Sequence, residues 1–152
     1  MNLAGTAPFL PLASAAANAM LLRRRHDDPG QNDTALEMVN DLVEALAPRI
    51  LCSSCENLIT EPVAGIEMQG RHRHEFMNPQ GYQFLIACYQ NAKGCQRTGE
   101  YTQEHCWFAG YQWCYALCNQ CHEHLGWHYF SASHSFFGLI CDRLIEKNDQ
   151  QT

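Results

Sequence analysis

The sequence lacks a long apolar run and a surplus of positive charge. No uninterrupted apolar stretch approaches the roughly 18 residues that a membrane-spanning helix needs, so a transmembrane protein is disfavoured. Lys and Arg number 10 against 16 Asp and Glu, which gives a formal net charge of −6. Binding to the phosphate backbone of nucleic acids depends on clustered Lys and Arg. We therefore expect neither a membrane nor a nucleic-acid partner.

The N-terminal segment lacks both hydrophobic periodicity and a complete targeting signal. Residues 1–33 are rich in Ala, Asn, Pro, Gly and Asp, a composition that predicts a disordered arm. Residues 1–20 contain an alanine-rich stretch like that of a signal peptide. They have no basic n-region, however, and Pro8 and Pro11 interrupt the apolar run. The expected location is the cytoplasm.

The nine cysteines cannot all be paired in disulfides, because their number is odd. Four of them form two Cys-x-x-Cys pairs, Cys52-Ser-Ser-Cys55 and Cys118-Asn-Gln-Cys121. In a reducing compartment such pairs indicate a metal site rather than disulfides, and two of them complete a tetrahedral Zn²⁺ shell. Four thiolates leave no open coordination position, which predicts a structural zinc. A redox-active pair is the alternative, and His122 or His124 is a possible substitute ligand.

One helix is expected before a β-rich domain. Apolar residues recur at helical spacing over residues 34–47, Thr34 and Glu37 form a capping-box pattern, and Pro48 ends it. We expect the apolar face of this helix to pack on the domain that follows, with binding to a partner as the alternative. Residues 48–147 alternate turn signals with short segments rich in aromatic and β-branched side chains, which predicts strands. Residues 148–152 are expected to form a tail.

All three tryptophans, Trp107, Trp113 and Trp127, lie close together in the sequence and surround the second cysteine pair. Indoles in such a cluster either fill a core or form the walls of a recess, and the residues alone leave both open. A recess of this kind accepts a cation such as methyl-lysine, held by the ring quadrupoles. It also accepts a small neutral ring whose polar edge is read by backbone groups.

Four strings of residues resemble the CULT domain family, the thalidomide-binding domain of cereblon, and especially its single-domain bacterial homologues. They match in order and spacing from about Leu51 to Leu144. The strings are His74-x-Phe76-x-Asn78-Pro79-x-Gly81-Tyr82, Trp107-Phe108-x-Gly110-Tyr111-x-Trp113, Cys118-x-x-Cys121-x-x-His124-Leu125-Gly126-Trp127-x-Tyr129 and the run from Phe136 to Leu144.

The resemblance implies a mainly β fold, the β-tent, in which two antiparallel sheets are pinned by Zn²⁺ on the four paired cysteines. It implies a pocket of three tryptophans, with Tyr129 at a fourth aromatic position. The expected guests are cyclic imides: glutarimide-type and thalidomide-like ligands, a cyclised C-terminal Asn or Gln of a peptide, and uracil-like rings. The contacts implied are the backbone carbonyl of His105, the backbone N–H of Trp107, the Asn78–Pro79 loop and Glu104 at the rim.

Nothing in this recognition requires a bond to break, so we expect a binding module rather than an enzyme. A role as a ubiquitin-ligase adaptor is expected to be doubtful, because the residues before Cys52 are too few for the Lon-like domain of cereblon. An enzyme resembling methionine sulfoxide reductase B is the alternative in another class, although the unpaired cysteines lack its Arg-x-Cys-x-Asn setting. A methyl-cation reader is a third hypothesis.

Overall fold

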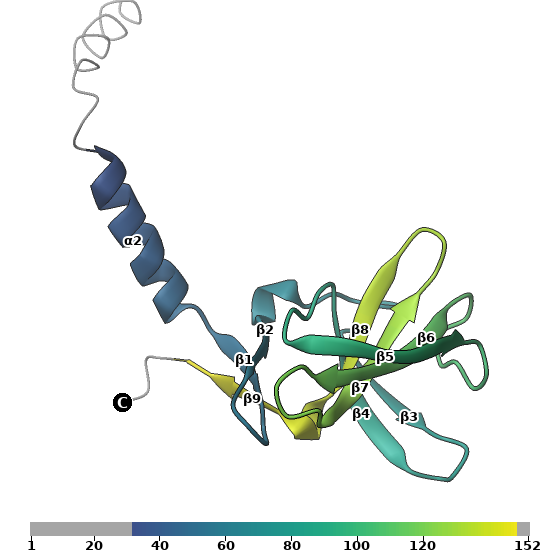
Figure 1. Cartoon of the computed structure of the whole chain (residues 1–152). Coiled ribbons are helices and arrows are strands. Elements are labelled where there is room, and N and C mark those ends of the chain that lie inside the picture. Colours follow the sequence, from purple (N-terminus) through teal and green to yellow (C-terminus); the bar gives the residue numbers. More distant parts are fainter. Residues whose placement is uncertain (1–31, 149–152) are drawn as a thin grey trace, which may run out of the picture. The chain divides into compact units, whose positions relative to one another are not determined.

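The structure is a computed structural model, and it describes residues 32–148 (Figure 1). The arm expected over residues 1–33 and the tail expected over residues 148–152 therefore lie almost entirely outside the described residues. The structure divides into two units, with the division between Leu42 and Val43. The domain boundaries proposed from the sequence stay predictions.

The helix α2 runs over Asn32–Leu46, close to the predicted 34–47. It ends just before Pro48 because a proline disfavours the helical conformation of the residue that precedes it. Its apolar side chains are exposed, Leu36 by 61% and Val43 by 62%. That this face packs on the following domain stays a prediction. Within residues 32–148, no helix has the length and apolar character to cross a membrane.

The rest of the described chain forms two antiparallel sheets, as the sequence predicts (Figure 1). The smaller sheet has the strand order β2-β1-β9, in which the first and last strands are neighbours. The larger sheet has the order β3-β4-β8-β7-β6-β5. The strands are β1 (Arg49–Cys52), β2 (Leu58–Thr60), β3 (Arg73–Met77), β4 (Gln83–Tyr89), β5 (Cys95–Thr102), β6 (Gln112–Cys118), β7 (His124–Phe130), β8 (Ser135–Ile140) and β9 (Leu144–Lys147), with single 3-10 turns at Pro62–Ala64 and Cys141–Arg143.

The two faces of the larger sheet support two apolar clusters. In β6 the burial alternates as expected for a strand: Cys114 and Ala116 are buried, whereas Tyr115 between them is 46% exposed. One cluster joins Ala116 and Cys118 to side chains of β1 and β2. The other lies around Phe108, Tyr129 and Phe136 and is largely aromatic. The second cluster supports the surface on which the tryptophans lie.

Gly94 is the point of closest approach between β2 and the turn that precedes β5. Its N–H donates to the carbonyl of Ile59 at 3.0 Å, and its carbonyl accepts from the N–H of Asn119 at 2.9 Å. A Cβ atom at position 94 would lie 2.0 Å from the carbonyl oxygen of Leu58, which is backbone and cannot rotate away.

We predict that Gly94→Ala lowers the free energy of unfolding by about 3 kcal/mol, because the two backbones must separate. Gly70→Ala is the matched control. Gly70 has φ +77°, and a Cβ there would meet no atom within 4 Å, so this variant loses only about 1–2 kcal/mol through backbone strain. Urea denaturation of both variants measures the difference. Equal losses would show that the contact at Gly94 is not tight.

Candidate metal centre and aromatic cavity

The two cysteine pairs occupy turns of the same construction at the ends of two strands. Cys52 closes β1 and Cys118 closes β6. In the first turn the N–H of Glu56 donates to the carbonyl of Cys52 at 2.8 Å, and in the second the N–H of His122 donates to the carbonyl of Cys118 at 2.9 Å. Glu56 and His122 both have φ +60°, in the left-handed region. Each turn therefore directs its two sulfurs to the same side, as in a zinc knuckle.

The four Sγ atoms come together from these two turns. All lie within 4.8 Å of one another. The Sγ atoms of Cys52 and Cys121 are 3.7 Å apart, and those of Cys55 and Cys118 are 3.6 Å apart. Four sulfurs at the usual Zn–S distance of about 2.3 Å form a tetrahedron with edges of about 3.8 Å. The residues therefore fit a Zn²⁺ ion, with no position left for a water or substrate.

The thiols of the cluster strongly affect one another's acidity. Burial raises the pKa of Cys118, but hydrogen bonds from the backbone N–H groups of Cys121 and Gln120 outweigh it and lower the pKa to about 7. At Cys55 the backbone N–H of Asn57 lowers the pKa, whereas burial and the neighbouring thiols raise it to about 12. Four thiolates at this spacing repel one another, and a divalent ion removes that repulsion.

Asn57 joins the two turns independently of a metal. Its side-chain amide donates to Sγ of Cys118 at 3.5 Å and to the side-chain oxygen of Asn119 at 2.8 Å. The histidines considered as substitute ligands do not lie among the four sulfurs: His122 is exposed, and the Nε2 of His124 lies 2.8 Å from the carbonyl oxygen of Gly126. The four paired cysteines are therefore the candidate metal-ligand set.

All nine cysteines are free thiols. Burial raises the pKa of Cys88 and of Cys95 to about 12, and it also raises the pKa of Cys106. A nucleophilic cysteine needs the opposite shift, because the thiolate is the reactive form. These three thiols therefore do not have the acidity of a catalytic nucleophile.

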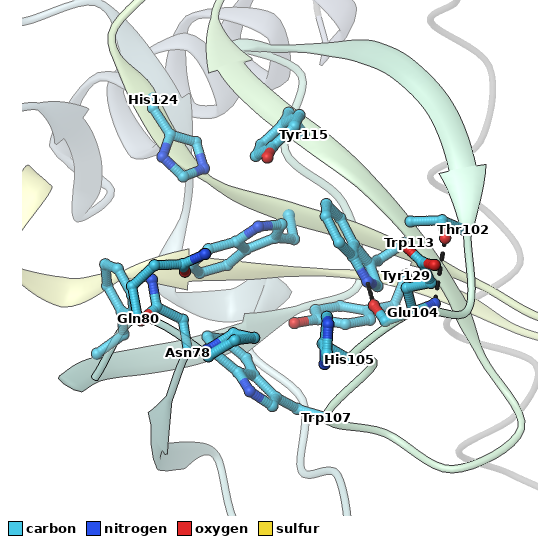
Figure 2. Close-up of a pocket in the computed structure, with 13 residues that line it drawn as sticks. Asn78, Gln80, Thr102, Glu104, His105, Trp107, Trp113, Tyr115, His124 and Tyr129 are labelled. Carbon is cyan, nitrogen blue, oxygen red and sulfur yellow. Dashed lines mark hydrogen bonds between the residues drawn. The ribbon is translucent and has the colours of Figure 1, made fainter. Parts of the chain in front are cut away.

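A cavity of about 480 Å³ opens on the face of the larger sheet that carries the tryptophans (Figure 2). The residues that the sequence predicts to contact a ligand all line it. Their binding of a ligand stays a prediction. The lining is Asn78, Pro79, Gln80, Phe84, Thr102, Glu104, His105, Trp107, Trp113, Tyr115, His124, Trp127 and Tyr129.

Each indole of the cavity is held in place by its surroundings. Trp127 is 8% exposed and meets Trp107 edge to face, with ring centroids 4.9 Å apart. The Nε1–H of Trp107 donates to the carbonyl of Met77 at 3.2 Å, and that of Trp113 donates to the carbonyl of Glu104 at 2.8 Å. These two hydrogen bonds satisfy the indole N–H groups without filling the cavity. One face of the Trp107 indole is covered, because it stacks on Phe76 with ring centroids 4.8 Å apart.

The segment between β5 and Trp107, which lines the cavity, contains backbone groups without a hydrogen-bond partner. His105 has φ +53°, a strained conformation for a residue other than glycine. Within residues 32–148, neither the carbonyl of His105 nor the N–H of Trp107 has a hydrogen-bond partner. They form an acceptor and a donor that suit a polar ligand edge.

The rim of the cavity is formed by two loops. In the loop between β3 and β4, the side-chain oxygen of Asn78 accepts from the N–H of Tyr82 at 2.9 Å, which fixes the turn that carries Pro79. Glu104 is exposed, and its N–H donates to Oγ1 of Thr102 at 3.1 Å. Figure 2 shows Glu104 and Thr102 on one side of the cavity and Asn78 and Gln80 on the other.

Sequence reasoning missed five of the lining residues: Gln80, Phe84, Thr102, Tyr115 and His124. Tyr115 follows from the alternation that already places Trp113 on this face. His124 does not, because alternation from Trp127 assigns it to the opposite face. The strand pairing shifts here: Ala116 pairs with Gly126, and Leu117 pairs with His124. The extra residue, Leu125, is a β-bulge that turns His124 to the cavity side.

No protein-family model matches the chain. Among curated proteins, it is 30% identical over 77 residues to Protein cereblon of Gallus gallus, a match that covers 47% of this chain and 17% of that protein. It is 33% identical over 95 residues to Protein cereblon of Drosophila melanogaster, covering 56% of this chain and 15% of that protein. The chain thus spans less than a fifth of the length of these relatives. This weak homology is consistent with a CULT-like domain, and it gives no support to the doubt about an adaptor role.

We predict that removal of one sulfur ligand destabilises the domain. Cys52→Ser should abolish stoichiometric zinc binding and lower the free energy of unfolding by about 4 kcal/mol, since three thiolates no longer close the ion's shell. Cys141→Ser, at a half-buried cysteine outside the cluster, is the control and should keep the metal. Metal content and thermal unfolding measure both effects. A Cys52→Ser protein with full zinc and unchanged unfolding would refute the centre.

Proposed function

We propose that this protein is a non-catalytic binding module for cyclic imides, held in shape by a structural zinc. The observation that carries the proposal is the combination of indole walls with an unpaired acceptor and donor in one cavity. The homology to cereblon agrees with it. The proposed guests are glutarimide-type ligands, including thalidomide-like compounds, the cyclised C-terminal residue of a peptide, and uracil-like rings.

An imide matches the backbone groups of the cavity. Along one edge it offers a carbonyl acceptor, an N–H donor and a second carbonyl acceptor. In our proposal the imide N–H donates to the carbonyl of His105, and one imide carbonyl accepts from the N–H of Trp107. Both protein groups lack a partner within the described residues. A ligand that supplies both partners makes two hydrogen bonds without breaking one within the protein.

The hydrocarbon side of the ring would lie among the three indoles. Trp107 and Trp127 meet at an interplanar angle of 75°, so they offer two walls of a corner. Trp113 is fixed separately, through its bond to the carbonyl of Glu104. Such walls bury the methylene groups of a ring by apolar contact. The aromatic cage, as a ligand site, remains part of this proposal.

Zinc would act on the cavity through the β6–β7 hairpin. β6 carries Trp113 at one end and Cys118 at the other, and β7 carries Trp127 and Tyr129. The metal would therefore fix the turn of the same hairpin whose strands hold the cavity walls. Its role in the proposed function is positional.

The two alternatives fit the cavity less well. Glu104 is the one carboxylate among the lining residues, and it is exposed at the rim, so a methyl-cation would find little charge to pair with. No cysteine is among the residues that line the cavity. A reductase resembling methionine sulfoxide reductase B needs a nucleophilic thiol at its substrate.

We predict saturable binding of glutarimide to the zinc-loaded protein, seen as a change in tryptophan fluorescence. N-methylglutarimide should bind at least about tenfold more weakly, because it cannot donate to the carbonyl of His105 and leaves that acceptor covered and unpaired. Trp113→Ala should weaken glutarimide binding by a similar factor through loss of one wall. Binding to the Trp113→Ala variant is measured by calorimetry, because the variant lacks one of the fluorescent indoles.

Two controls accompany this titration. Succinamide, an open-chain diamide, offers carbonyls and N–H groups without the ring and should not compete. Trimethyl-lysine peptide tests the methyl-cation alternative in the same assay. Absence of saturable glutarimide binding by folded, zinc-loaded protein would refute the proposed function.

A further inference from the structure

Cys95 is a fifth thiol at the candidate metal centre, although it is not among the four candidate ligands. It begins β5 and lies directly opposite Cys118 in the pairing of β5 with β6 (Figure 1). Opposite residues of two paired strands place their side chains on the same face of the sheet. Cys95 also packs against the apolar cluster that contains Cys52 and Cys118. Its thiol therefore lies on the same side of the sheet as the sulfur of a metal ligand.

The hydrogen bonds around this pair determine how closely the two cysteines approach. The N–H of Asn119, the residue after Cys118, donates at 2.9 Å to the carbonyl of Gly94, the residue before Cys95. Cys95 and Cys118 are therefore a non-hydrogen-bonded pair, the kind whose Cα atoms lie about 4.5 Å apart. Disulfides join cysteines whose Cα atoms are about 4.4–6.8 Å apart. A bond between the two sulfurs is thus within reach of side-chain rotation.

The position of Cys95 is fixed by the turn that precedes β5. Its own N–H donates to the carbonyl of Ala92 at 3.0 Å. The neighbouring Gly94 donates to the carbonyl of Ile59 in β2 and accepts from the N–H of Asn119. β2 follows the first cysteine turn, and Asn119 lies within the second. The backbone therefore holds the Cys95 thiol between the two turns that carry the metal ligands.

We propose that Cys95 is a resolving cysteine for the metal centre: oxidation of Cys118 by hydrogen peroxide joins Cys118 to Cys95 in a disulfide and removes Cys118 from the ligand set. When an ion is bound, the sulfurs of the other three ligands are coordinated to it, so Cys95 supplies the free thiol that faces Cys118. This disulfide consumes one ligand, whereas a disulfide within the shell consumes two. The three thiolates that remain do not close a tetrahedral shell.

The chemistry takes two steps and one molecule of peroxide. The Cys118 thiolate attacks one peroxide oxygen: an S–O bond forms, the O–O bond breaks, and hydroxide leaves. That hydroxide takes the proton of the Cys95 thiol, whose sulfur attacks the Cys118 sulfur. An S–S bond forms, and the S–O bond breaks with loss of a second hydroxide. The two sulfurs together lose two electrons, which the two peroxide oxygens gain. Peroxide is small and neutral, and it reaches the shell on the side of Cys121, which is exposed.

The disulfide acts on the hairpin that carries two walls of the cavity. Cys118 ends β6, which also carries Trp113, and Trp127 lies on β7. Loss of Cys118 from the ligand set removes the metal cross-link between this hairpin and the first cysteine turn. The resolving thiol also protects the ligand, because a disulfide can be reduced again whereas a cysteine sulfinic acid cannot. Cys95 thus makes the loss of the cross-link reversible.

The test treats the zinc-loaded full chain with hydrogen peroxide and follows the released zinc with a coloured chelator. Free thiols are then alkylated, and mass spectrometry of a proteolytic digest identifies the linked cysteines. The wild-type protein should release its zinc and contain a disulfide between Cys95 and Cys118. Dithiothreitol followed by added zinc should restore nearly all of the bound metal, because the disulfide is reducible.

Variants at two cysteines identify the resolving thiol. Cys95→Ser should bind zinc as the wild-type protein does, because all four candidate ligands are retained. After peroxide, its Cys118 should carry sulfinic acid, and less than about half of the zinc should return after dithiothreitol. Cys141→Ser is the matched control. Cys141 packs against the same apolar cluster but lies in the 3-10 turn Cys141–Arg143, so this variant should form the disulfide and recover like the wild-type protein.

The mapping of the wild-type protein decides the matter without any variant. A disulfide between two metal ligands, with the Cys95 thiol still alkylated, overturns the inference. Recovery of zinc by Cys95→Ser to the wild-type level also overturns it, since no resolving thiol would then be needed. A wild-type chain that holds no zinc overturns the inference together with the metal centre.

Discussion

The structure depends on the convergence of four sulfurs from two turns that are far apart in the chain. Cys52 ends the first strand of the small sheet, and Cys118 ends a central hairpin strand of the large one. Without a cation this arrangement brings together four groups that repel when ionised. With one, it is a cross-link between the sheets that costs little chain entropy at the moment of metal binding, because both turns are already formed by their own hydrogen bonds.

The cysteine cluster and the cavity share one hairpin, and they use different faces of its strands. On one face of β6, small side chains such as Ala116 pack against the small sheet. On the other face, Trp113 and Tyr115 line the open cavity. The same alternation that buries the cysteine side therefore exposes the aromatic side. A core and a recess follow from opposite faces of a single strand.

The sequence predicts the parts of this arrangement that follow from local period or spacing. The two-residue spacing of the cysteines predicts the turns, and alternation in β6 predicts which side chains share a face. Alternation does not predict the position of His124, because a β-bulge interrupts the two-residue period within β7. The only sign of that bulge in the sequence is a glycine, Gly126. Phe84 escapes it because β4 reaches the cavity through tertiary packing against Trp127, at 5.3 Å between ring centroids. The unpaired backbone groups have no side-chain signature at all.

Two indole hydrogen bonds fix walls of the cavity next to those backbone groups. An indole that is free to rotate would give the cavity no fixed wall, and ordering it would cost free energy. The bonds from Trp107 to Met77 and from Trp113 to Glu104 prevent this, since each uses the only donor of its indole. The second of them ties a wall to the residue just before His105, whose φ of +53° is strained. One hydrogen bond thus joins an indole wall of the cavity to the residue that precedes the strained His105.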